Sequence, residues 1–196
     1  LRAPVDAGSL HAQLLGVLPF QPTGAQQRAD REIAIDLART QPMHRLLQGD
    51  VGSGKTLVAA LAAARCIDAG FQCALMAPTE ILASQHFGKL VGWLDSLLAA
   101  RGLRVAWLTG SQKKKERDAM EAIVGSGEAA PGVGTHAGAR ERPLFILLVG
   151  SRSEVLSAYR TLSRSGSPAL SADRSKFALF TPEPATAWLG ASAPVQ

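Results

Sequence analysis

Apolar residues follow two alternating patterns between residue 23 and about residue 137 of this chain. Segments with apolar positions three and four residues apart indicate amphipathic helices, and short continuous apolar runs indicate buried strands. The helical segments are 23–40, 55–69, 79–100 and 111–127, and the strand segments are 44–48, 72–77, 104–109 and 132–136. Strands that alternate with helices at this spacing predict an α/β fold, a parallel sheet with helices on its faces.

Polar residues and glycines mark the ends of these predicted helices. Thr23 is a preferred N-cap residue, and Gln26 occupies the capping-box position three residues later. Thr79 and Ser111 occupy the cap position before the helices over 79–100 and 111–127. Gly70 follows the Ala-rich segment 55–69 and predicts its end, because glycine adopts the left-handed conformation that closes a helix.

The periodic pattern ends at Ala137. Residues 138–143 form a polar break, residues 144–149 (LFILLV) are an apolar run of strand length, and residues 153–165 have the pattern of a short helix. The remainder is rich in Ser, Ala and Pro and has no sustained period. The chain therefore divides into a linker remnant over 1–22, an α/β domain over 23–137 and an unassigned tail over 138–196.

Composition restricts the classes of protein that this chain can belong to. A hydrophobic fraction of 46% and a charged fraction of 19% in 196 residues are typical of a globular protein. The net charge of +5 weakly favours polyanionic partners. Cys66 and Cys73 have the spacing of neither a zinc site nor a disulfide framework, so we interpret them as buried apolar residues.

The sequence predicts a cytoplasmic location without a membrane anchor. Its longest apolar run, residues 144–149, is too short to cross a bilayer. Residues 1–20 lack the basic start and long apolar core of a signal peptide. Because the sequence begins with Leu1 and not with methionine, we expect the true start to lie upstream.

The strongest chemical signal is GDVGSGKT at residues 49–56, which fits the phosphate-loop pattern G-x-x-x-x-G-K-[ST]. Its members are Gly49, Asp50, Val51, Gly52, Ser53, Gly54, Lys55 and Thr56. Glycines let backbone N–H groups approach the phosphates, and the following helix adds its unpaired N-terminal N–H groups. Lys55 is expected to reach the β- and γ-phosphates, and the Thr56 hydroxyl to ligate Mg²⁺. An ordinary Gly/Ser turn is the alternative, but the position between a strand and a helix favours nucleotide binding.

Five segments resemble one family when they are taken in order. They are LPFQPTGAQQ, LLQGDVGSGKT, MAPTEILASQH, VAWLTGS followed by KKK, and GTHA. Over residues 12–137 they resemble the RecG family of bacterial ATP-dependent DNA helicases, members of superfamily 2 that remodel branched DNA such as forks and Holliday junctions. The resemblance implies an incomplete RecA-like motor domain, ATP and Mg²⁺ as cofactors, DNA as the partner and a monomeric protein.

The resemblance also implies roles for residues outside the phosphate loop. Phe20 and Gln26 would recognise adenine. Contacts to the DNA backbone would come from the loops at the strand ends, through Pro78, Thr79, Glu80, Thr109, Gly110, Thr135 and His136.

Each of these side chains also has a purely structural interpretation. Gln26 is equally suited to a capping box, and Thr79 and Ser111 to plain helix caps. Lys113, Lys114 and Lys115 have the pattern of a solvated helix face as well as of a DNA-binding patch. His136 has the alternative of packing, and the apolar surroundings of Trp93 and Trp107 favour the core over base stacking.

The sequence after GTHA lacks the acidic motif that would complete such a motor. In the family, the strand after GTHA ends in Asp-Glu-x-His, which supplies the Mg²⁺ ligand and polarises the attacking water. Here that run ends in Gly150, Ser151 and Arg152, no Asp-Glu pair occurs after Ala137, and Glu154 does not match the motif. The second motor domain and the N-terminal wedge domain have no counterpart either.

We therefore expect the chain to bind ATP but to hydrolyse it inefficiently and not to unwind DNA alone. The alternatives are an ATP-binding module with weak nonspecific DNA binding and no turnover, or a non-functional product whose incomplete sheet leaves an exposed edge.

Overall fold

The computed structural model describes residues 8–39, 43–50, 52–77, 79–109, 111–135, 145–150 and 176–180. Its helices are α1 (Leu10–Val17), α2 (Gly24–Leu37), α3 (Lys55–Asp68), α4 (Glu80–Ala99) and α5 (Lys114–Ser126). Its strands are β1 (His44–Gln48), β2 (Gln72–Ala77), β3 (Arg104–Leu108), β4 (Ala129–Thr135), β5 (Phe145–Gly150) and β6 (Lys176–Phe180). The predicted alternation of helix and strand over residues 23–137 is confirmed.

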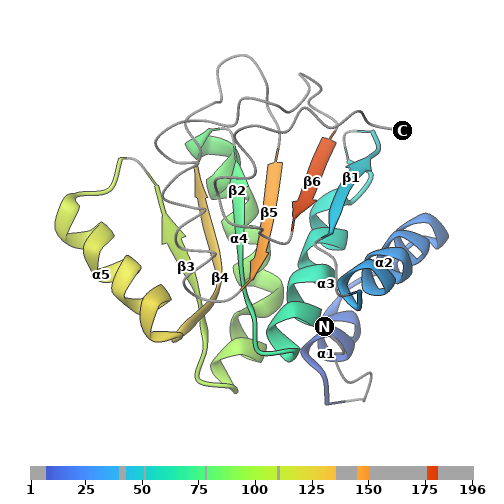
Figure 1. Ribbon diagram of the computed structural model, residues 1–196, viewed down its shortest axis with the longest axis horizontal. Coiled ribbons are helices and arrows are strands. Elements are labelled where there is room, and N and C mark those ends of the chain that lie inside the picture. Colours follow the sequence, from blue (N-terminus) through green and yellow to red (C-terminus); the bar gives the residue numbers. More distant parts are fainter. Residues whose placement is uncertain are drawn as a thin grey trace.

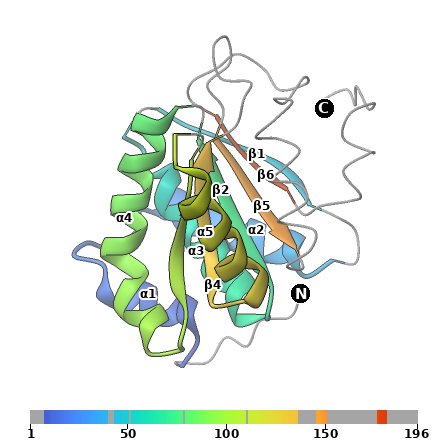
Figure 2. The ribbon, with the colours of Figure 1, turned by 90° about the vertical axis from the view of Figure 1, so that its left-hand side faces the viewer.

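All the described strands form one sheet, in the order β1-β6-β5-β2-β4-β3 (Figure 1). Helices α3 and α4 pack on its strands, α1 and α2 pack on α3, and α5 contacts β3 and β4. Figure 2 shows α4 running beside the sheet from the phosphate-loop end towards the opposite end. The predicted α/β class, with a parallel arrangement flanked by helices, is confirmed for β2, β4 and β3, which pair in parallel.

The strands after Ala137 run in the opposite direction. β5 pairs antiparallel with β2 and parallel with β6, and β6 pairs antiparallel with β1. Parallel strands need a crossover of about a dozen residues or more. Only residues 136–144 separate β4 from β5, which is too short for such a crossover. The strand expected at 144–149 is thus confirmed as β5, whereas the helix expected at 153–165 lies outside the described residues.

Two of the three predicted helix caps are confirmed. The Thr23 hydroxyl accepts from the Gln26 N–H at 3.3 Å, and the Thr23 N–H donates to Gln26 Oε1 at 2.9 Å. The Thr79 hydroxyl accepts from the Leu82 N–H at 3.3 Å and begins α4. After α3, Gly70 has φ +79°, which confirms it as the stop.

The prediction that Ser111 caps the next helix is wrong. α5 begins at Lys114, and its N-cap residue Lys113 makes no side-chain cap. The Ser111 N–H instead donates to Glu80 Oε1 at 2.9 Å, and the Thr109 N–H donates to Gln112 Oε1 at 2.9 Å. Side chains thus hold the turn after β3 in a non-helical path, so the helix begins only when the turn is complete.

Helix α1 lies within residues 1–22, the segment interpreted as a linker remnant. Ser9 caps it by accepting from the Ala12 N–H at 3.1 Å, and Leu10 and Leu14 are fully buried. The Asp68 carboxylate accepts from the Leu10 N–H at 2.7 Å and the His11 N–H at 3.1 Å. The segment therefore packs on the α/β core, and its role as a linker to another domain stays a prediction.

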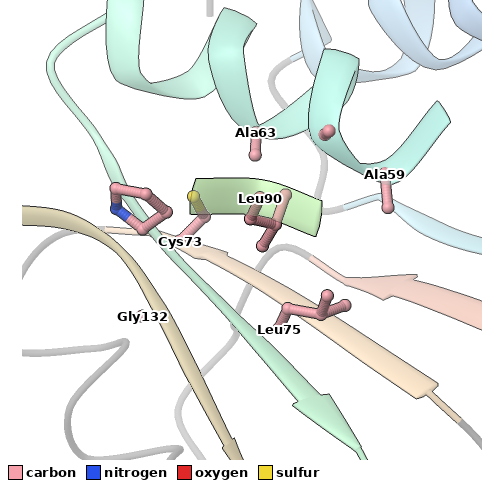
Figure 3. A pocket seen from close by; sticks show the side chains of 8 residues that line it. Ala59, Ala63, Cys73, Leu75, Leu90 and Gly132 are labelled. Atoms are coloured by element: carbon pink, nitrogen blue, oxygen red, sulfur yellow. The ribbon is translucent and has the colours of Figure 1, made fainter. Parts of the chain in front are cut away.

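Small side chains let α3 approach the sheet closely. Every residue of α3 from Thr56 to Ala64 is buried. A small apolar cavity remains between α3, α4 and the strands (Figure 3), lined by Ala59, Ala60, Ala63, Cys73, Leu75, Leu90, Pro131 and Gly132. Cys66 and Cys73 are free thiols, and burial raises the pKa of Cys73 to about 12, so the prediction of buried apolar cysteines is confirmed.

Two tryptophans of the described residues also belong to the core, as the sequence predicts for them. Trp93 and Trp107 are partly buried and pack against the main apolar cluster. The ring of Trp107 lies 5.0 Å from that of Phe87, centroid to centroid, in a tilted arrangement. In the described part of the chain no helix combines the length and apolar character needed to cross a membrane.

Candidate nucleotide-binding site

The phosphate loop connects the carboxyl end of β1 to the first residue of α3. The Ser53 N–H donates to the Asp50 carbonyl at 3.1 Å, which closes a tight turn. Gly52 and Gly54 have φ values of +85° and +81°, which residues with a Cβ rarely adopt. Val51 lies outside the described residues. The strand–loop–helix context that the motif requires is therefore present.

The Lys55 ammonium lies over this loop. Its Nζ donates to the carbonyl oxygens of Gly49 and Asp50, both at 2.7 Å, and lies 3.4 Å from Ser53 Oγ. These contacts hold a positive charge at the centre of the loop, close to the N-terminus of α3 and its partial positive charge. A Cβ on Gly49 would lie 2.8 Å from Ser53 Oγ, so a side chain there would displace the Ser53 hydroxyl. The charge and the tight backbone suit a triphosphate.

Gln26 connects α2 to the phosphate loop. Its Nε2 donates to the Ser53 carbonyl at 2.9 Å, while its Oε1 completes the capping box with Thr23. The capping interpretation of Gln26 is thus confirmed. The side chain also braces the loop, a role that sequence spacing did not indicate. Phe20 is 46% exposed just before this helix, and adenine recognition by Phe20 and Gln26 stays a prediction.

The Thr56 hydroxyl lies 3.1 Å from Nδ1 of His86, a residue of α4, and both residues are buried. Burial lowers the pKa of His86 to about 4, and the nearby positive charge of Lys89 adds to the effect. His86 is therefore neutral at pH 7. Sequence analysis did not single out His86, although it lies within the quoted segment MAPTEILASQH.

The residues present fit Mg²⁺ only as a cation that arrives with the nucleotide. Among the described residues, no group of three or more His, Cys, Asp and Glu side chains is placed to hold a metal. Thr56 offers a single hydroxyl oxygen beside the lysine and the start of α3. Magnesium at such sites keeps few protein ligands and takes the remainder from phosphates and water. Thr56 would be the protein ligand here.

The described members of the DNA-binding set expected from the resemblance lie at one edge of the sheet. Thr79 and Glu80 follow β2, Thr109 follows β3, and Thr135 ends β4. These strands are parallel, and β1 points the same way, so the phosphate loop lies at the same edge. Pro78, Gly110 and His136 lie outside the described residues.

Two of these loops are held together by side chains. Glu80 accepts from the Ser111 N–H at 2.9 Å, which connects the loop after β2 to the loop after β3. Thr109 is only 1% exposed, and its hydroxyl lies 3.4 Å from Ser111 Oγ. Lys113, Lys114 and Lys115 are exposed beside this edge. Contact of any of them with DNA stays a prediction.

The direction of β5 bears on the acidic motif that the resemblance places at the end of this strand. Gly150, its last residue, pairs with Gln72, the first residue of β2. The carboxyl end of β5 therefore lies at the sheet edge opposite the phosphate loop. A strand inserted in this direction cannot deliver an acidic side chain from its carboxyl end to the γ-phosphate.

Comparison with known proteins identifies the class. The family profile of DEAD/DEAH box helicases matches residues 26–138, more than half of the chain. The chain therefore belongs to the DEAD/DEAH box helicase family.

Within that class, the chain is similar to proteins described as ATP-dependent DNA helicase RecG, which confirms the resemblance seen in the sequence. It is 53% identical to the Escherichia coli (strain K12) protein over 143 residues, which are 72% of this chain and 20% of the relative. It is 43% identical to the Mycobacterium bovis protein over 138 residues, 67% of this chain and 19% of the relative. The chain spans about a fifth of the length of these relatives.

One solved structure supports the same assignment. It is described as RecG bound to a three-way DNA junction, and it is 41% identical with a TM-score of 0.59. The match covers 65% of this chain and 17% of that one. The incomplete RecA-like motor domain predicted from the sequence is thereby confirmed as the fold of the matched region.

Proposed function

We propose that this chain is the ATP-binding part of a RecG-like DNA helicase that acts on branched DNA in the bacterial cytoplasm. The observation that carries the proposal is the assembled phosphate loop, in which Lys55 contacts Gly49 and Asp50 and Gln26 braces Ser53. The similarity to RecG proteins supports ATP as the nucleotide and DNA as the partner. The same similarity suggests a monomer.

Different residues of the chain would bind different parts of the nucleotide. Lys55 would neutralise the β- and γ-phosphate oxygens, and backbone N–H groups at the start of α3 would donate to them. Mg²⁺, held by Thr56 and the phosphates, would neutralise charge on the phosphate oxygens. Phe20 and Gln26 would meet the adenine, at the side of the loop where Gln26 already lies.

The chain alone is proposed to hydrolyse ATP slowly. A general base and an arginine finger contribute strongly to phosphoryl transfer, the finger alone about 10³- to 10⁵-fold. The antiparallel direction of β5 keeps its carboxyl end away from the phosphate loop. This observation favours the second candidate function, an ATP-binding module that contacts DNA weakly without turnover.

Calorimetric titration with Mg-ATP tests the proposal. The unmodified chain is expected to bind saturably, and Lys55→Ala to lose binding because its phosphate contacts are gone. Lys115→Ala is the matched control. It removes the same charge from an exposed position of α5 and should leave ATP affinity unchanged. Absence of ATP binding by a folded chain would overturn the proposal.

DNA binding is tested separately, with a labelled three-way junction and a single strand. Affinity is expected to be weak and to fall with salt, because backbone contacts release counterions. Replacing Lys113, Lys114 and Lys115 together by alanine should reduce the salt dependence. DNA-stimulated release of phosphate that disappears in Lys55→Ala would contradict the proposed lack of efficient turnover.

A further inference from the structure

His86 lies among apolar residues on the buried side of α4. The other buried positions of this helix are Ala83, Leu90, Leu94 and Leu98. A buried imidazole is costly unless it is hydrogen-bonded, and a leucine would satisfy the packing alone. The hydrogen bond between His86 Nδ1 and the Thr56 hydroxyl, 3.1 Å long and buried, supplies a reason for a histidine here. It joins the second residue of α3 to the second turn of α4.

The contact restricts the direction of the Thr56 hydroxyl. A threonine within a helix divides between two χ1 rotamers, because its hydroxyl can also bond to a carbonyl of the preceding turn. An acceptor on the neighbouring helix selects one direction. A neutral imidazole has one acceptor nitrogen, and a hydroxyl has one hydrogen and two lone pairs. Whichever group donates, the hydrogen bond fixes the Thr56 hydroxyl in relation to His86 and leaves at least one lone pair of its oxygen available to a cation.

We propose that His86 is a positioning residue for magnesium, which orients the Thr56 hydroxyl so that its oxygen can ligate the cation of Mg-ATP. The inference rests on the proposed nucleotide site and deepens it. Outer partners of this kind orient metal ligands, and replacing them typically weakens metal-dependent binding about 10- to 100-fold. His86 itself touches neither metal nor phosphate in this proposal.

Two amide variants separate positioning from packing. His86→Asn places an acceptor oxygen near the position of Nδ1, whereas His86→Gln places it farther out, near the position of Nε2. ATP affinity is measured by calorimetry with Mg²⁺ and with EDTA, and the ratio of the two affinities is compared among variants. We expect His86→Asn to keep most of the magnesium enhancement and His86→Gln to lose about tenfold of it. Affinity in EDTA should be the same in both.

A second pair of variants tests whether His86 acts through Thr56. In a Thr56→Ala background the hydroxyl is gone, so adding His86→Gln should cause no further loss of the magnesium enhancement. Additive losses would overturn the proposal, as would a His86→Gln effect that is equal with Mg²⁺ and with EDTA. A chain that binds no ATP under either condition would instead overturn the proposed nucleotide site, and this inference with it.

Discussion

Nε2 of Gln26 donates to the carbonyl oxygen of Ser53 at 2.9 Å and so connects the first turn of α2 to the phosphate loop. Oε1 of the same side chain accepts from the Thr23 N–H at 2.9 Å. One amide group thus caps a helix with its acceptor and braces the nucleotide site with its donor. The two functions can be separated because they use different atoms.

Gln26→Glu is expected to keep the cap and to lose the brace. Glutamate preserves the capping-box acceptor but offers no N–H group to Ser53, and it brings a negative charge towards the triphosphate. We expect thermal stability close to that of the unmodified chain and ATP affinity weaker by about tenfold, from one lost hydrogen bond and added repulsion. Thr23→Ala is the matched control: it should cost about 1 kcal/mol of unfolding free energy with ATP affinity retained.

Gly54→Ala is expected to disrupt the loop more than Gly52→Ala. Both glycines have positive φ, at +81° and +85°, so either substitution strains the backbone by about 1 kcal/mol. A Cβ on Gly54 would also collide with the Gln26 side chain, whereas a Cβ on Gly52 would meet nothing within 4 Å. Denaturant unfolding and ATP titration of the two variants measure the difference. Equal losses of stability and ATP affinity in the two variants would show that the Gln26 side chain moves aside at no cost in free energy.

The Asp30 carboxylate is expected to make the fold sensitive to strong acid. Burial alone raises its pKa, but hydrogen bonds from His11 and Arg65 outweigh burial and lower the pKa from 3.8 to about 2. Arg65 Nη2 lies 2.7 Å and His11 Nε2 3.1 Å from Asp30 Oδ2. The native state therefore binds the proton less readily than the unfolded chain does.

The sign of the pH dependence follows from this lowered pKa. The stabilisation by Asp30, about 2 kcal/mol, is complete above about pH 4 and is lost as the pH falls towards about 2. Urea unfolding across this range should show a steeper loss for the unmodified chain than for Asp30→Asn, which has no carboxylate to titrate. The same dependence of unfolding free energy on pH in both proteins would contradict the assignment of the acid sensitivity to Asp30.

Gly132→Ala is expected to stabilise the protein. Gly132 lies in β4 beside the apolar cavity of Figure 3, and a Cβ there would lie 3.9 Å from the Cys73 carbonyl and 4.0 Å from Ala74 Cβ. These are ordinary contacts, so the gain in buried surface and the loss of unfolded-state freedom give about 0.5–1 kcal/mol. Gly70→Ala is the control, because its φ of +79° predicts a loss of stability. A lower melting temperature for Gly132→Ala would refute the prediction.

Local sequence patterns predicted the elements of residues 23–137 well, because each depends on nearby residues. The capping box of Thr23 and Gln26, the Thr79 cap and the Gly70 stop involve partners a few residues apart. The prediction for Ser111 was wrong for the opposite reason, because its interaction partner is distant in the sequence. Its N–H is taken by Glu80, a partner 31 positions away that no local rule indicates.

Helix α1 shows a second limit of local patterns. Its eight residues are too few to form a stable helix in isolation. It is held by the burial of Leu10 and Leu14 and by the Asp68 carboxylate, which lies more than fifty positions along the chain from the N–H groups that it accepts from. The composition of residues 1–22 did not reveal that partner.

The sequence by itself determined the phosphate loop, because its chemistry requires certain residue types at fixed spacing within a single turn. It also determined most of the helices and strands within residues 23–137, since hydrophobic period and capping are local properties. Only the tertiary structure decided the strand order, with β5 and β6 placed between β1 and β2 and running against them. The pairing of His86 with Thr56 was likewise decided there, because it depends on how α3 and α4 pack against each other.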